Sequence, residues 1–210
     1  MTAPDGSETV LTGLTLSEAL RSPRFWKITI SLMLLTLVYS GMAAALPFLL
    51  RSQGATPSTS AMVMVLLGVG TFAGRVVDGI TLDRWFAPSV VIAITLVSML
   101  AFIMLALIPN PRTMAIAAAL IGLGLGAEFA AGAYIASRAY GRRALGATLG
   151  VQSLGVSLGV PIGGTAIGAS FAEGMIQPQI VFGASFAVLL AAVAIMRSLS
   201  RSELPFGVSH

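Results

Sequence analysis

Three ionisable side chains lie within long apolar stretches of the sequence: Arg75, Asp78 and Glu128. On insertion scales, a charge at the centre of a hydrocarbon layer costs about 2.5–3.5 kcal/mol. Such side chains persist where they face a cavity or one another, so each is a candidate functional residue. For Glu128 two interpretations stay open. It is either a carboxylate that binds protons or faces a substrate, or one half of a fixed ion pair.

Arg75 also has two interpretations. A guanidinium binds a carboxylate through two parallel hydrogen bonds, so Arg75 could anchor an anionic substrate. Alternatively it forms a structural contact with Asp78 or Asp83. Arg75 lies nine residues before Arg84, and Glu128 lies ten residues before Arg138, so the two have similar depths along their helices. We therefore expect both side chains to point into one cavity, paired directly or bridged by water or substrate.

The residue inventory argues against several kinds of catalysis. The chain has no cysteine, and its one histidine is the last residue, His210. Thiolate chemistry, cysteine-bound metal and an intramembrane Ser–His protease are therefore not expected. A pair of intramembrane aspartates is also lacking, and no Walker-type phosphate loop is present. The sequence thus predicts a protein that is not an enzyme and needs no metal or cofactor.

The composition indicates that lipid is the solvent of this chain. Of its 210 residues 56% are hydrophobic and 10% are charged, whereas soluble domains average about 25% charged residues. The net charge of +4 comes from basic residues that lie singly at the ends of apolar runs, which argues against nucleic-acid binding. The first 20 residues are polar and mixed, without the apolar core of a cleavable signal peptide.

A helix needs about 20 apolar residues to cross the hydrocarbon core of a bilayer. Six such helices are expected, near Trp26–Leu50, Ser58–Thr81, Pro88–Ile108, Arg112–Arg138, Leu145–Ser170 and Pro178–Arg197. We divide the chain into a cytoplasmic segment with a short amphipathic helix (1–25), a transmembrane bundle (26–197) and a cytoplasmic tail (198–210). With six spans, ten of the 12 Lys and Arg residues fall at or near one side of the membrane, and only Arg51 and Arg112 fall on the opposite side. The positive-inside rule then places both termini in the cytoplasm. We expect the protein to lie in the cell membrane.

Small residues recur at intervals of four in two of the expected helices. This spacing lets helix backbones approach closely, so we predict packing roles for them. They are Gly70 and Gly74 in the second span, and Gly146, Gly150, Gly155, Gly159, Gly163, Gly164 and Gly168 in the fifth. Gln152 is predicted to form an interhelical hydrogen bond rather than to bind a substrate. Pro47 and Pro161 are predicted to kink their helices.

Two motifs resemble one family of membrane proteins, the major facilitator superfamily. The corner after the second span resembles that family's signature between its eighth and ninth helices, through Gly74, Arg75, Asp78, Gly79, Asp83 and Arg84. The fourth span is similar to the tenth helix of the monocarboxylate-porter and oxalate/formate-antiporter branch, through Gly122-Leu123-Gly124-Leu125-Gly126-Ala127-Glu128 and Arg138, Arg142 and Arg143. The chain departs from that branch at Ala130, where members often carry an acid, and at Gly159-Val160-Pro161, where they often carry Gly-Pro.

The resemblance implies an all-α membrane protein that forms the C-terminal six-helix half of a transporter. It implies secondary transport of a small solute, an organic anion such as a monocarboxylate, with the Gly74–Arg84 corner acting as part of the cytoplasmic gate. The expected partners are the lipid bilayer, a carboxylate substrate, and a missing N-terminal half or a second copy of the chain. The alternative is a transport-inactive truncated fragment or a membrane scaffold.

Overall fold

The computed structural model describes residues 15–82, 84–140, 144–172 and 177–199, and these residues are predominantly helical. The elements are α1 (Leu16–Arg21), α2 (Pro23–Ser52), α3 (Pro57–Leu82), α4 (Ala87–Leu107), α5 (Pro111–Tyr140), α6 (Leu145–Ser157), α7 (Gly159–Gly163), the π-helix η1 (Gly164–Gly168), α8 (Ala169–Ala172) and α9 (Pro178–Arg197). Among the described residues, six helical segments are long and apolar enough to span a bilayer, with α6 to α8 together forming the fifth. The predicted all-α fold with six spans is confirmed.

The short amphipathic helix predicted before the first span is α1. The Thr15 side chain caps its first turn by accepting from the Glu18 backbone N–H, and the Glu18 carboxylate accepts from the backbone N–H of Thr15. The following helix, α2, begins at Pro23, three residues earlier than predicted. Proline suits the first turn of a helix because that turn leaves its N–H groups unpaired. The indole N–H of Trp26 donates to the Leu20 carbonyl at 2.9 Å and ties the two helices together.

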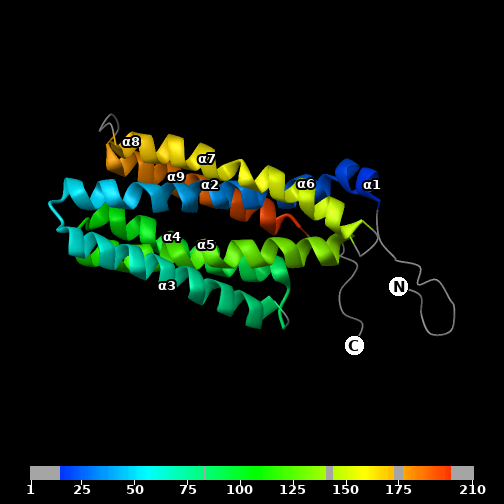
Figure 1. Cartoon of the computed structure of the whole chain (residues 1–210). Coiled ribbons are helices and arrows are strands. Elements are labelled where there is room, and N and C mark those ends of the chain that lie inside the picture. The colour runs from blue at the N-terminus through cyan, green and yellow to red at the C-terminus, as the bar shows by residue number, and fades with distance from the viewer. Residues whose placement is uncertain (1–14, 83, 141–143, 173–176, 200–210) are drawn as a thin grey trace.

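The long helices run side by side, with α3 along one edge of the bundle and α7 and α8 along the opposite edge (Figure 1). In the most apolar 18-residue stretch of α2, and in that of α5, 56% of the residues are buried, so these two helices form the centre of the bundle. The corresponding values are 17% for α3 and 22% for the fifth segment. These two segments therefore carry the most exposed surface, on either side of α5.

Backbone contact joins α3 to α5. A Cβ atom added at Gly70 would lie 2.1 Å from the Ala119 carbonyl oxygen, and one at Gly74 would lie 2.2 Å from that of Leu123. From the other side, a Cβ at Gly126 would lie 2.0 Å from a carbonyl oxygen of α3. No side chain fits at these separations, so the predicted packing role of Gly70 and Gly74 is confirmed.

The fifth segment packs on α2 through only some of its glycines. A Cβ at Gly159 or Gly163 would lie 2.6 or 1.9 Å from a carbonyl oxygen of α2, and one at Gly155 would lie 2.8 Å from the Thr29 methyl group. The packing prediction is wrong for three others, because no atom of the described residues lies within 4 Å of a Cβ added there: Gly146, Gly150 and Gly164. At Gly168 the contact is an ordinary 3.7 Å.

The two prolines within spans behave differently. Pro47 lies inside α2, which stays one continuous helix of 30 residues. Around Pro161 the fifth segment is irregular: α6 ends at Ser157, and a π-helical turn, η1, begins at Gly164, three residues after the proline. A proline removes one backbone donor and crowds the preceding turn, which accounts for a local break in the helical hydrogen bonding.

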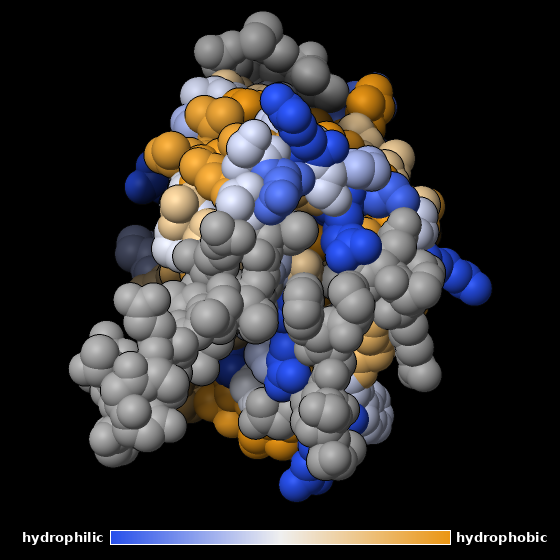
Figure 2. Space-filling model, turned by 90° about the vertical axis from the view of Figure 1, so that its right-hand side faces the viewer, coloured by the Kyte–Doolittle hydropathy of each residue, from blue (hydrophilic) through white to orange (hydrophobic). Residues whose placement is uncertain are grey.

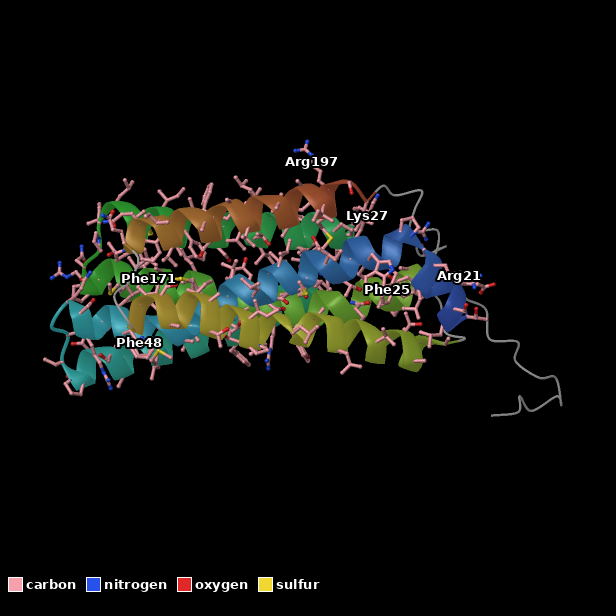
Figure 3. The ribbon with its side chains drawn as sticks, turned by 90° about the horizontal axis from the view of Figure 1, so that it is seen from above. Arg21, Phe25, Lys27, Phe48, Phe171 and Arg197 are labelled. Carbon is pink, nitrogen blue, oxygen red and sulfur yellow. The ribbon has the colours of Figure 1, made fainter. Side chains whose placement is uncertain are left out.

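Basic side chains gather at the end of the bundle that carries α1. Arg21, Lys27 and Arg197 lie toward this end, whereas Phe48 and Phe171 lie toward the other (Figure 3). Viewed onto the α1 end, the surface shows hydrophilic side chains grouped over the helix ends (Figure 2). Arg51 and Arg112 lie at the opposite end, in the last turn of α2 and the first turn of α5. The charge asymmetry expected from the sequence is therefore present along the bundle axis.

Candidate functional site

A cavity of about 290 Å³ lies between α2, α5 and the fifth segment. Its lining combines an apolar wall with a small group of polar side chains. The lining residues are Leu32, Thr36, Leu125, Glu128, Phe129, Gly132, Ala133, Leu149, Gln152, Ser153, Val156, Ser157 and Val160. Ligand sites typically measure about 300–1,000 Å³ and combine mostly apolar walls with a few polar groups, so this cavity suits a small solute.

Glu128 lies at the buried end of this cavity, with 6% of its surface exposed. The Thr36 hydroxyl of α2 donates to its Oε1 atom, while Oε2 has no hydrogen-bond partner within the described ranges. The same hydroxyl lies 3.0 Å from the Leu32 carbonyl oxygen. Because a hydroxyl carries one proton, Thr36 can donate to only one of them at a time. When Glu128 is protonated, Thr36 can accept from the acid and donate to Leu32. The pair therefore suits a carboxyl group that gains and loses a proton.

Gln152 of α6 faces the same cavity and is 3% exposed. Its Nε2 donates to the Gly132 carbonyl of α5 at 3.4 Å, so the predicted interhelical hydrogen bond is confirmed. A carbonyl oxygen can only accept, which fixes the amide with its N–H₂ group toward α5. Its Oε1 atom is buried, without a hydrogen-bond partner among the described residues. Gln152 therefore joins two helices and keeps an unused acceptor in a side chain that lines the cavity.

A buried tyrosine lies against α5 one turn before Glu128. Tyr39 of α2 is 1% exposed, which agrees with a place in the core. A Cβ added at Gly124 would lie 2.5 Å from the Tyr39 ring and 2.7 Å from the Ser98 hydroxyl of α4. The missing side chain at Gly124 thus lets α2 and α4 close on α5. This contact fixes the helix that carries Glu128.

Arg75 lies on the exposed face of α3, beside the cavity rather than in its lining. Its guanidinium carbon is 5.8 Å from the centroid of the Phe129 ring, and Phe129 is a lining residue that is 78% exposed. The expected direct pairing with Glu128 is absent in the described residues, where Thr36 contacts that carboxylate instead. The two residues have similar depths along α3 and α5, but their side chains point in different directions around the helix axes. Arg75 is on an exposed face of its helix, whereas Glu128 is on a buried one. A bridge through water or solute stays a prediction.

The residues of the corner motif are divided between the inside and the outside of the bundle. Asp78 is fully buried on the face that α3 turns to α5, together with Gly74. Neither carboxylate oxygen has a hydrogen-bond partner in the described part of the chain, so no Arg75–Asp78 clamp is present there. Gly79 and Arg84 are exposed, and Asp83 lies outside the described residues.

At the end of α5, the guanidinium carbon of Arg138 lies 5.2 Å from the Tyr134 ring centroid. Arg142 and Arg143, predicted with it, lie outside the described residues.

The sequence alone did not indicate Thr36 and Phe129 as neighbours of the site. Thr36 is a polar residue within an apolar run, and Phe129 follows Glu128 directly. Both features are visible in the sequence but are common in any membrane helix.

Comparisons with known proteins agree with this architecture. The family model described as Major Facilitator Superfamily matches residues 9–206. No curated protein matched the chain. Among solved structures, a bacterial homologue of the human lysosomal transporter Spinster, inward-facing and unoccupied, superposes with a TM-score of 0.66 and 19% identity, over 100% of this chain and 55% of that one. Its occupied form gives a TM-score of 0.62 and 20% identity, over 91% and 52%. The chain thus spans about half the length of these transporters.

Proposed function

Because this chain belongs to the Major Facilitator Superfamily, we propose that it forms the C-terminal half of a secondary transporter that carries a small solute through the Glu128 cavity. The observation that carries the proposal is a buried carboxyl group at the end of a solute-sized cavity. A single ionisable group among apolar walls is costly unless it binds something. Transporters of this fold bind substrates and coupling ions near the bilayer midplane.

In this proposal Glu128 is the group that binds the coupling proton. Among the described lining residues it is the one acid or base, and the polar ones beside it in that lining are Thr36, Gln152, Ser153 and Ser157. Thr36 can reverse its hydrogen bond as the carboxyl group gains or loses its proton. Protonation of Glu128 would therefore change the hydrogen bond that joins α2 to α5.

The solute class that the sequence favours is a small organic anion such as a monocarboxylate. Arg75 supports it, because its guanidinium lies over the Phe129 ring at the edge of the cavity. Within the described residues the guanidinium forms no ion pair with Asp78 or Glu128. An anion would then bind on the α3 side of Phe129, where Arg75 can reach it bidentately.

We further propose that α3 and the fifth segment face a second six-helix unit, either a separate N-terminal half or a second copy of this chain. The exposed face of these helices carries Arg75, Ser153 and Ser157, which would be unfavourable against lipid. The chain also covers only 55% of the Spinster homologue.

The orientation completes the proposal. The end of the bundle that carries α1 would face the cytoplasm, with the lone Arg51 and Arg112 outside. The corner residues Gly74, Asp78, Gly79, Asp83 and Arg84 would then form part of the cytoplasmic gate, and Arg138, Arg142 and Arg143 would lie at the same side.

Uptake into proteoliposomes tests the function. The full chain is reconstituted, an inward proton gradient is imposed, and uptake of radiolabelled lactate is measured against empty liposomes. We expect gradient-driven uptake that falls to background in Glu128→Gln. The matched control, Glu18→Gln, changes an acid in the α1 capping box and should leave uptake unchanged. In Arg75→Ala, the concentration for half-maximal uptake should rise at least about tenfold, since hydrogen bonds to charged groups contribute about 1.5–3 kcal/mol.

The competing candidate is a transport-inactive fragment or membrane scaffold, which the large exposed face of α3 and the fifth segment favours. It predicts no uptake above empty liposomes in the presence or absence of the gradient, whether the chain is reconstituted alone or together with a separate N-terminal half, and no difference between the chain and Glu128→Gln.

A further inference from the structure

We propose that the polar end of the cavity binds an ammonium group of the solute, held between Oε2 of Glu128 and Oε1 of Gln152. The inference rests on the proposed function, because it takes this cavity as the solute site. It adds one feature of the solute, an ammonium group. Its starting observation is that both oxygens are buried, both belong to residues that line one cavity, and neither has a hydrogen-bond partner in the described structure.

The two side chains come from different helices and line the same cavity. Glu128 is 6% exposed on α5, and Gln152 is 3% exposed on α6. Leaving a buried acceptor unsatisfied costs about 1–3 kcal/mol, more for a charged group. Two such acceptors around one cavity therefore indicate a site that a bound group with hydrogen-bond donors completes.

The donors of Thr36 and Gln152 are already used within the protein, while the lining hydroxyls of Ser153 and Ser157 can each donate or accept. The Thr36 proton goes to Glu128 Oε1 or to the Leu32 carbonyl, and the Gln152 N–H₂ group is turned toward the Gly132 carbonyl. The described lining residues include no Lys, Arg or His. An ammonium group supplies three donors and no acceptor, and it also neutralises a carboxylate. A carboxylate solute at the same position would meet like charge at ionised Glu128.

The rest of the lining suits an apolar body attached to that group. Leu32, Leu125, Leu149 and Val156 form walls, and Phe129 offers an aromatic ring beside the polar end. An aromatic face also attracts a cation at close range. A solute that carries an ammonium group as well as a carboxylate would place the carboxylate near Arg75, whose guanidinium lies over the Phe129 ring.

Equilibrium binding to the full chain in lipid nanodiscs at neutral pH tests the proposal. Isothermal titration calorimetry compares three probes with the same phenylalkyl body: phenethylamine, 2-phenylethanol and phenylacetate. Phenethylamine should bind tightest and phenylacetate weakest. Glu128→Gln and Gln152→Leu should each weaken phenethylamine binding at least about tenfold, consistent with the loss of a hydrogen bond to a charged group. Binding of 2-phenylethanol to Glu128→Gln should change less than phenethylamine binding does. Gln179→Leu, a matched change in a different cavity beside α9, should leave all three unchanged.

Phenylacetate binding as tightly as phenethylamine would overturn the proposal. So would phenethylamine that fails to bind, or that binds Glu128→Gln and Gln152→Leu as well as it binds the unmodified chain. If Glu128→Gln does not fold, Gln152→Leu alone decides, because it leaves the carboxyl group in place. Lactate uptake without phenethylamine binding refutes this inference and leaves the proposed function standing. Phenethylamine binding with no uptake of lactate or phenethylamine refutes the proposed function instead.

Discussion

The Thr36 hydroxyl donates to the Glu128 carboxylate across 92 positions of the chain, and this bond joins the two most buried helices, α2 and α5. The same hydroxyl has a second acceptor, the Leu32 carbonyl, one turn earlier on α2. Thr36 can therefore respond to the protonation state of Glu128 without moving its helix. This pair is the polar centre around which the apolar cavity is built.

Removing the Thr36 hydroxyl should weaken the site while preserving its shape. Thr36→Val keeps the branched side chain but takes away a hydrogen bond to a charged group, which contributes about 1.5–3 kcal/mol. We expect gradient-driven solute uptake to fall at least about tenfold in proteoliposomes. Thr36→Ser keeps the donor and should retain most of the uptake. Equal uptake in the valine and serine variants would show that the hydroxyl has no part in the site.

The contact between α3 and α5 makes a prediction about stability that separates two glycines of one helix. Gly70→Ala puts a Cβ atom 2.1 Å from the Ala119 carbonyl oxygen, whereas at Gly68 no atom lies within 4 Å. Overpacking costs about 1–3 kcal/mol or more, so Gly70→Ala should lower the thermal unfolding midpoint in detergent. Gly68→Ala should leave it unchanged or raise it, because alanine favours a helix by about 1 kcal/mol over glycine. The packing account fails if the two variants unfold at the same temperature.

Orientation can be read with reporter fusions along the chain. Fusions after Arg51 and Arg112 should report the external side, and fusions after Arg84 and Arg143 the cytoplasm. The physical reason is the excess of Lys and Arg at the α1 end of the bundle. A reporter after Arg112 that reads as cytoplasmic would contradict both the orientation and the number of spans before it.

The spans could be predicted because length and apolar composition alone decide whether a helix crosses a bilayer. Six helices were expected, and the described residues contain six. Glu128 was found for a related reason, since an acid within an apolar run is costly and therefore conspicuous. Glycine spacing located the α3–α5 contact, but it gave wrong results at Gly146, Gly150 and Gly164, where the helix face meets no neighbour.

The details of the site could not be predicted in the same way. Thr36 gave no signal, because hydroxyl groups in membrane helices commonly bond to their own backbone, as Thr71 and Thr165 do here. The direct Arg75–Glu128 pairing failed because residue counts give depth along a helix but not the direction in which a side chain leaves it. Phe129 is next to Glu128 in sequence, yet only the fold shows that its ring lies under the Arg75 guanidinium at the edge of the cavity.

Transport through the Glu128 cavity, as proposed here, requires that this cavity opens in turn to both sides of the membrane. Since the chain has no cysteine, single thiols can be placed cleanly. Ser153→Cys lies in the exposed part of the cavity lining, and Leu100→Cys lies on the apolar outer face of α4 as the control. In sealed right-side-out and inverted membrane vesicles, a membrane-impermeant thiol reagent should label Ser153→Cys from both sides and Leu100→Cys from neither. Labelling of Ser153→Cys from one side alone, or from neither, would contradict transport through this cavity.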